Sequence, residues 1–175
     1  LEGVDAIFGL HLWQLLSTGV VGIVKGAMMA QPDKFTIRIW GKGGHGSMPH
    51  QTVDPILVAS HLVVNIQSIA SRNIDPLKPA VVSLGTIEGG TIYNIIPEEV
   101  VLTGTVRSFD AGVQKLSETR LKEITEGTCA AFGATGEFHY EKGYPPLVND
   151  EAMVDFVVQT TGDIFGKKYL QEIST

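Results

Sequence analysis

Apolar and polar residues alternate along residues 34–40, where Phe35, Ile37 and Ile39 fall on one side of an extended chain. A period of two residues is typical of a strand with one buried face. The sequence therefore predicts a half-buried strand over this segment.

Two longer segments have the patterns of helices. Asp54 followed by Pro55 is a typical helix start, with Asp as the N-cap and Pro at the first helical position. The apolar residues that follow predict a helix over residues 54–72. A second helix is predicted over residues 112–133, with a charged side, an apolar side and a stop at Gly133.

Further strands are predicted over residues 80–90, 92–108 and 136–143, and a further helix over residues 150–166. Between residues 33 and 143 the predicted order is thus β-α-β-β-α-β. This order predicts an α+β fold of the ferredoxin-like plan, in which an antiparallel sheet carries both helices on one face.

Residues 4–13, from Val4 to Trp13, are nearly all apolar and predict a strand buried on both faces. His11 lies inside this run. Two interpretations stay open for His11: a core histidine bonded to a backbone group, or a metal ligand at the end of a central strand.

The helix predicted over residues 54–72 has no charged residue between Asp54 and Arg72, and apolar residues circle most of it. A helix that is apolar all round is buried on more than one side. We therefore expect a homodimer through this helix.

Composition narrows the classes of function. The formal net charge is −6, from 13 Lys and Arg against 19 Asp and Glu, and no basic stripe is present. Nucleic acid is therefore excluded as an expected partner. No apolar run approaches the ~20 residues that span a bilayer, so no membrane partner is expected. The single cysteine, Cys129, excludes an internal disulfide and fits the reducing cytoplasm.

Candidate chemistry begins in the glycine-rich loop GKGGHGSMPH, residues 41–50, which holds His45 and His50. Glycines there allow positive φ and the close approach of a backbone or ligand, so His45 can be presented at a loop tip. Asn94 follows a Gly-Gly turn, and Arg107 ends a predicted strand. Asn and Arg together suit a substrate carboxylate, although each residue alone also has an ordinary structural explanation.

Several segments resemble the M20 metallopeptidase family, and most closely its amidohydrolase branch of hippurate hydrolases, N-acyl-amino-acid aminoacylases and auxin-conjugate hydrolases. In chain order they are GVDAIFGLHLW, GGHGSMPH, DPI, SRNIDPLKPAVVSLG, GGTIYNIIPEEVVLTGTVRSFD and GYPPLVND. The resemblance covers essentially the whole chain.

The resemblance implies an α/β catalytic domain with a divalent di-metal site of zinc, manganese or cobalt, and a ferredoxin-like lid inserted into it. Residues 1–30 would be a piece of the catalytic domain with a linker, residues 31–144 the lid, and residues 145–175 the return to the catalytic domain. It also implies a homodimer formed by the lid's first helix, residues 54–72, and the adjacent edge strand.

The resemblance implies roles for four residues. His11 matches a metal-binding histidine, and His45 matches the lid histidine that enters the partner subunit's active site and stabilises the oxyanion. Asn94 and Arg107 match residues that hold the carboxylate of an N-acyl amino acid. The resemblance transfers no catalytic role to His50.

Other parts of the family's machinery are missing from this sequence: its Asp-rich metal strand, its His-x-Cys-Gly-His loop, its Gln-Pro-x-Glu-Glu segment with the general base, and its last histidine. We therefore expect the chain to be part of a longer enzyme, a metal-dependent amidohydrolase, and to be inactive alone. The alternative is a free-standing ferredoxin-like dimerisation module that binds a small carboxylate through Asn94 and Arg107.

Overall fold

The computed structural model describes residues 2–173. The chain divides into two compact units, one formed by residues up to Met29 together with those from Leu147 onward, the other by Ala30–Pro146. The second unit contains every predicted site residue except His11.

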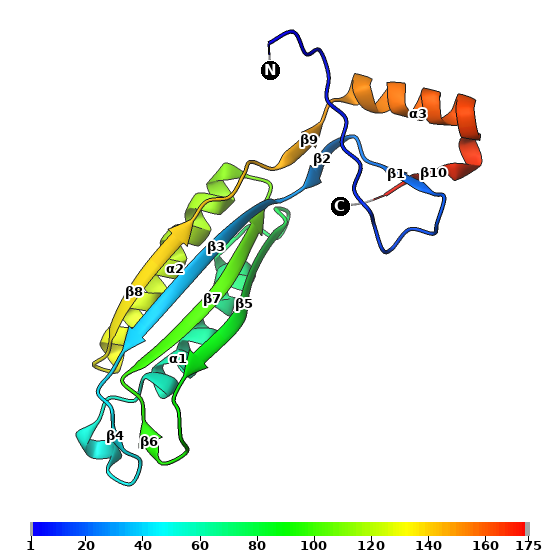
Figure 1. The fold of residues 1–175 in the computed structure, drawn as a ribbon. Helices are drawn as coiled ribbons and strands as arrows, with labels where there is room; N and C mark the ends of the chain where they lie inside the picture. Colours follow the sequence, from blue (N-terminus) through cyan, green and yellow to red (C-terminus); the bar gives the residue numbers. More distant parts are fainter. Residues whose placement is uncertain (1, 174–175) are drawn as a thin grey trace. The chain divides into compact units, whose positions relative to one another are not determined.

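The second unit is built on a four-stranded sheet in which all neighbouring strands are antiparallel (Figure 1). The strand order across the sheet is β5-β7-β3-β8. Its strands are β3 (Gln31–Trp40), β5 (Ala80–Gly89), β7 (Glu99–Ser108) and β8 (Thr135–Glu141). The two central strands, β3 and β7, pair along their whole length, from Gln31 opposite Ser108 to Trp40 opposite Glu99.

The alternation in β3 decides which face of the sheet is buried. Phe35, Ile37 and Ile39 are 0% exposed, whereas Lys34 and Arg38 on the other side are exposed. The half-buried strand predicted over residues 34–40 is therefore confirmed. Both long helices of this unit cover the same apolar face, as Figure 1 shows.

Helix α1 (Pro55–Asn65) begins as the sequence predicts, because the Asp54 side chain accepts hydrogen bonds from the backbone of Ile56 and Leu57. The helical segment ends at Asn73, next to the predicted Arg72, but it is not one regular helix. The regular helix ends at Asn65, and a wider π-helical turn over Ile69–Asn73 follows it.

Helix α2 (Ala111–Ala131) is capped by the Asp110 side chain, which accepts from Val113 at 2.9 Å. Gly133, with φ 73°, ends it as predicted. The buried side of α2 includes Ser117 and Thr125, whose hydroxyls donate to backbone carbonyls one turn earlier.

One continuous strand over residues 92–108 is not formed. Residues 92–94 belong to a loop, and a short strand β6 (Ile95–Ile96) is separated from β7 by Pro97 and Glu98. Proline lacks the backbone donor that a continuous strand needs. Strand β6 pairs instead with another short strand, β4 (Gly44–His45).

The first unit contains two small pairs of strands and one helix. Strand β1 (Val21–Ile23) runs parallel to β10 (Leu170–Glu172), and β2 (Gly26–Met29) runs antiparallel to β9 (Leu147–Asn149). Helix α3 (Glu151–Phe165) is capped by the Asp150 side chain, and the helix predicted over residues 150–166 is confirmed.

The predicted strand Val4–Trp13 is wrong for this chain. None of its residues is in a strand, and Leu10 and Leu12 are each 90% exposed. A strand needs neighbours for its backbone hydrogen bonds. Among the described residues none pairs with this segment.

Among the described residues, no helix combines the length and the apolar character needed to cross a membrane.

Candidate functional site

The structure places His45 and Asn94 side by side. Strands β4 and β6 pair with His45 opposite Ile95, and the Gly46 backbone N–H donates to the carbonyl oxygen of Asn94 at 2.8 Å. The two short strands form a tip beyond the end of the main sheet (Figure 1). Two residues far apart in the sequence thus share one exposed site.

Glycines allow the two loops to approach this closely. A Cβ at Gly43 would lie 2.9 Å from the carbonyl oxygen of Ile96, and one at Gly46 would lie 3.0 Å from that of Asn94. The expected close approach of a backbone is therefore present. The positive φ allowed at Gly43 is not used.

The imidazole of His45 is exposed, and its Nδ1 atom is held from within the loop. The backbone N–H of Ser47 donates to Nδ1 at 3.2 Å, and the Ser47 hydroxyl lies 2.7 Å from the same atom. His50 lies nearby on a single 3-10 turn, Pro49–Gln51, and is also exposed.

Asn94 carries an unpaired acceptor. Its Oδ1 atom is buried and has no hydrogen-bond partner among the described residues. Buried polar atoms in folded proteins are nearly always paired with protein, water or ligand. The atom therefore suits a hydrogen-bond donor from a bound molecule.

Arg107 lies at the opposite end of the sheet from this tip. It stands opposite Pro32 near the start of β3, whereas the tip joins the sheet at Trp40 and Glu99. Eight residues of strand separate Glu99 from Arg107, which is about 25 Å. Within one chain, Arg107 is thus not brought together with His45 and Asn94.

The Arg107 side chain is nevertheless held in place. Its guanidinium donates to the hydroxyl of Thr105 and, at 3.3 Å, to the carbonyl of Val106. The Thr105 hydroxyl donates in turn to the backbone carbonyl of Asp33 at 2.7 Å. Arg107 remains half-buried with its charge unpaired by any carboxylate among the described residues.

His11 lies in the first unit and is exposed. Its Nδ1 lies 2.6 Å from the carbonyl of Leu12, and its ring packs edge-on against Trp13. No group of three or more His, Cys, Asp or Glu among residues 2–173 could hold a metal. The described residues therefore do not form a metal centre by themselves.

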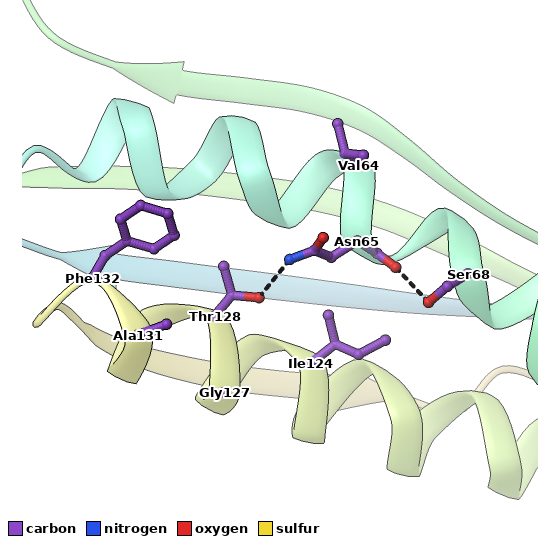
Figure 2. A pocket seen from close by; sticks show the side chains of 8 residues that line it. All are labelled: Val64, Asn65, Ser68, Ile124, Gly127, Thr128, Ala131 and Phe132. Atoms are coloured by element: carbon purple, nitrogen blue, oxygen red, sulfur yellow. Dashed lines mark hydrogen bonds between the residues drawn. The ribbon is translucent and has the colours of Figure 1, made fainter.

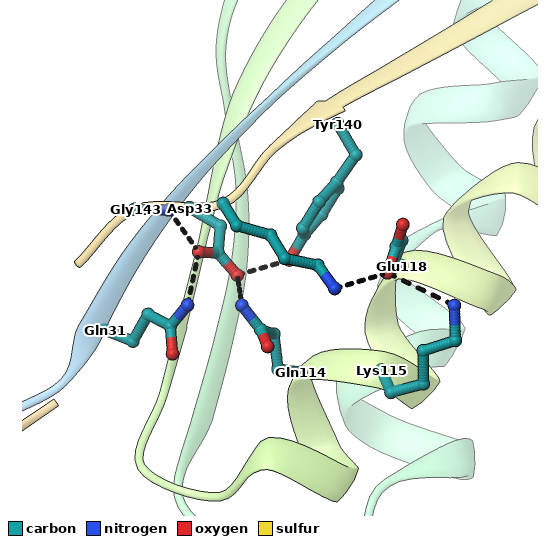
Figure 3. Close-up of polar contacts among 8 residues, drawn as sticks. Gln31, Asp33, Gln114, Lys115, Glu118, Tyr140 and Gly143 are labelled. Atoms are coloured by element: carbon teal, nitrogen blue, oxygen red, sulfur yellow. Dashed lines mark hydrogen bonds and ion pairs between the residues drawn. The ribbon is translucent and has the colours of Figure 1, made fainter. Parts of the chain in front are cut away.

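Sequence analysis missed a polar cluster around Asp33, which is 2% exposed. As Figure 3 shows, its carboxylate accepts four hydrogen bonds from different parts of the unit. The donors are the side chains of Gln31, Gln114 and Tyr140 and the backbone N–H of Gly143, at 2.7–3.0 Å. The alternation in β3 contains the missed signal, because Asp33 falls on the same side as Phe35 and Ile37.

Two opposing effects act on the Asp33 carboxyl. Burial alone would raise its pKa, but the hydrogen bonds from Tyr140, Gln114, Gly143 and Gln31 outweigh burial and lower the pKa below the usual value. Burial and the bond to Asp33 raise the pKa of Tyr140. Asp33 is therefore held as a buried anion that joins β3, α2 and the end of β8.

A groove lies elsewhere, between α1 and α2 (Figure 2). Val64, Ile124 and Phe132 line its apolar part, and Asn65 donates across it to the Thr128 hydroxyl at 3.1 Å. None of the predicted site residues lines this groove.

These features define an α+β domain with an exposed tip at which a histidine loop lies against an asparagine loop. Residues 33–127 match the peptidase dimerisation domain family, M20_dimer. The chain belongs to this family, and the resemblance inferred from its sequence motifs is confirmed.

Individual relatives agree with the family. The chain is 47% identical over 149 residues to an N-acyl-L-amino acid amidohydrolase of Geobacillus stearothermophilus, covering 85% of this chain and 40% of that protein. It is 38% identical to the hippurate hydrolase of Campylobacter jejuni, covering 94% of this chain and 43% of that protein. The chain thus spans well under half the length of these relatives.

A solved structure also resembles the chain. The YXEP protein of Bacillus subtilis is described as a dinuclear metal binding peptidase from the M20 family. It superposes with a TM-score of 0.70 at 28% identity, over 99% of this chain and 42% of that one.

Proposed function

We propose that this chain is the lid and dimerisation part of a divalent-metal-dependent amidohydrolase that cleaves the amide bond of N-acyl amino acids. The observation that carries the proposal is that the loops of His45 and Asn94 lie against each other at the exposed tip of a peptidase dimerisation domain. The relatives named N-acyl-L-amino acid amidohydrolase and hippurate hydrolase support this substrate class.

We assign residues 31–144 to the lid and residues 1–30 and 145–175 to the catalytic domain. The element order and the strand order β5-β7-β3-β8 support a ferredoxin-like plan for the lid. The exposure of Leu10 and Leu12 supports a longer protein over the free-standing module, because further chain would cover these side chains.

Each lid residue has a distinct part in amide hydrolysis. When water adds to the amide carbon, the carbonyl oxygen gains negative charge, and the exposed ring of His45 donates a hydrogen bond to it. Asn94 binds a polar group of the substrate through its unpaired side chain. Arg107 presents a guanidinium, which pairs with a carboxylate through two parallel hydrogen bonds.

A divalent metal belongs to the proposed enzyme, with the family and the dinuclear neighbour as support. Since the described residues do not form a metal centre, we assign its remaining ligands and the general base to other segments of the complete protein. His11 would contribute one ligand. This chain alone is expected to be inactive.

The separation of Arg107 from the tip supports a site that is built from two subunits. One lid cannot hold a single substrate with both ends of its sheet, about 25 Å apart. In a symmetric dimer, His45 and Asn94 of one subunit would meet Arg107 of the other. The homodimer would form through α1 and edge strand β5, where Ile56 and Ile87 are 47% and 59% exposed.

The test is His45→Ala in the complete protein, with an N-acetyl amino acid as substrate. We expect kcat to fall by ~10²-fold or more, the usual effect of removing one oxyanion donor. His50→Ala is the matched control, since His50 is exposed in the same loop and has no proposed role. Equal kcat values for the two variants would refute the role of His45.

A further inference from the structure

The loop that presents His45 also constrains where the proton of its ring can reside. Ser47 directs two groups at Nδ1, its backbone N–H at 3.2 Å and its hydroxyl at 2.7 Å. A backbone N–H can only donate, so Nδ1 must offer a lone pair to it. In the neutral ring, this contact therefore favours the proton on Nε2, and the Ser47 hydroxyl adds a second donor to Nδ1 that favours the same form.

We infer that Ser47 is a positioning residue that holds His45 in the Nε2–H form. The inference rests on the proposed function, in which His45 donates to the amide oxygen. Ser47 touches neither the substrate nor the reacting atoms, and it acts only through the ring.

The turn keeps Ser47 in place against the ring. The backbone N–H of Met48 donates to the carbonyl of His45 at 2.9 Å, which closes a tight turn over residues 45–48. The turn keeps the Ser47 hydroxyl close enough to donate to Nδ1, at 2.7 Å. If the proton were on Nδ1, that N–H would face the backbone N–H of Ser47, and the two donors would repel each other.

The position of the proton matters for an oxyanion. A donor must already point to the place where negative charge develops. The Nε2–H form presents that donor on the side of the ring away from Ser47. The other form would present a lone pair there, which repels the oxyanion, just as a wrong histidine tautomer is known to impair catalysis in serine proteases. No proton leaves His45 in this role.

The first measurement is the ring nitrogen spectrum of this chain at a pH of about 8.5, where free histidine is neutral. Nδ1 and Nε2 are distinguished by their ¹⁵N shifts, and His45→Ala identifies the signals among the five histidines. We expect a predominantly Nε2–H ring in the unmodified chain. In Ser47→Ala, loss of one hydrogen bond should lower the ratio of the two forms roughly 2- to 10-fold. Ser47→Thr, which keeps a hydroxyl, should restore the ratio.

The second measurement is kcat of the same variants in the complete protein. With Ser47→Ala, kcat should fall in proportion to the measured fraction of the Nε2–H ring, with KM unchanged, and Ser47→Thr should restore it. A ring nitrogen spectrum unchanged by Ser47→Ala overturns the inference. A kcat that stays constant while the fraction of the Nε2–H ring changes also overturns it. Failure of the proposed function is distinguishable, because His45→Ala would then leave kcat unchanged whatever the spectrum shows.

Discussion

Gly46 donates its backbone N–H to the carbonyl oxygen of Asn94 at 2.8 Å, and this bond fixes the loop of His45 against the loop of the asparagine. The two loops are so close that a side chain at Gly46 would meet the backbone of Asn94, because its Cβ would lie 3.0 Å from the carbonyl oxygen. A Cβ at Gly43 would meet the carbonyl oxygen of Ile96 at 2.9 Å. The geometry of the tip therefore depends on backbone contacts more than on side-chain packing.

Gly43→Ala should accordingly impair activity while leaving the fold intact. The added methyl group pushes against a backbone oxygen, so the two loops must separate by several tenths of an ångström. Misplaced catalytic groups lose rate steeply, and we expect kcat of the complete protein to fall about 10-fold or more. Gly127→Ala in α2 is the control, because no atom would lie within 4 Å of the added Cβ. Steady-state kinetics and thermal unfolding of both variants would separate a loss of activity from a loss of stability.

A second pair of glycines should respond with opposite signs. In β7, a Cβ at Gly104 would lie 2.2 Å from the Phe35 ring and 2.4 Å from the Ser83 carbonyl oxygen. Gly104→Ala should lower the free energy of unfolding by about 1–3 kcal/mol. Gly127, within α2, has open space around it, and Gly127→Ala should raise that free energy by about 0.5–1 kcal/mol. Urea unfolding of both variants provides the measurement. Equal changes in the free energy of unfolding would contradict the crowding at Gly104 and the open space at Gly127.

Patterns with a strict period predicted the fold well. The alternation of Phe35, Ile37 and Ile39 allows only one buried face, and the Asp54-Pro55 pair allows only one helix start. The strand expected at Val4–Trp13 failed because a continuous apolar run says nothing of the neighbours that a strand requires. Pro97 was visible in the sequence, yet its interruption of the strand over 92–108 became clear only from the pairing of β6 with β4.

Candidate site residues could be selected one by one from the sequence, but their arrangement could not. The glycines around His45 indicate a presented side chain, and motif resemblance picks out Asn94 and Arg107. Whether these residues meet depends on strand register, which joins His45 to Asn94 and carries Arg107 to the other end of β7. The Asp33 cluster was missed because its donors come from segments far apart in the chain.

Asp33 should make the free energy of unfolding depend on pH in the acid range. Its pKa is lower in the folded chain than in the unfolded one, so its contribution is complete above the unfolded value near 4. That contribution is lost as the pH falls through the folded pKa. Urea unfolding between about pH 2 and pH 7 should show stability falling at the acid end of this range.

Asp33→Asn should remove most of this dependence. Because an amide has one acceptor oxygen and one donor group, two of the four donors would face an N–H₂ group. We expect a loss of about 2 kcal/mol or more at neutral pH, since buried donors would remain unpaired. Asp163→Asn, at an exposed position of α3, is the control and should change neither quantity. An Asp33→Asn variant with the same acid dependence as the unmodified chain would assign that dependence to other carboxyls.

The dimer proposed through α1 and β5 should be sensitive to a charge on its apolar surface. Ile56→Arg would place a cation where two chains are expected to bury an apolar face, and a buried unpaired charge is strongly unfavourable. Sedimentation at tens of micromolar should show a dimer for the unmodified chain and a monomer for this variant. Tyr144→Arg, at another exposed position of the lid, should remain dimeric. A monomeric unmodified chain would rule out this interface.

Mixed dimers test whether each site takes residues from two subunits. His45→Ala and Arg107→Ala subunits of the complete protein should each be nearly inactive alone. If His45 of one subunit works with Arg107 of the other, a mixed dimer contains one intact site and one site lacking both residues. Random exchange of subunits would then restore about one quarter of the unmodified activity, because half of the dimers are mixed and half of their sites are intact. If both residues served the same subunit, every site in the mixture would lack one of them and no activity would return. The separation along β7 leads us to expect recovery.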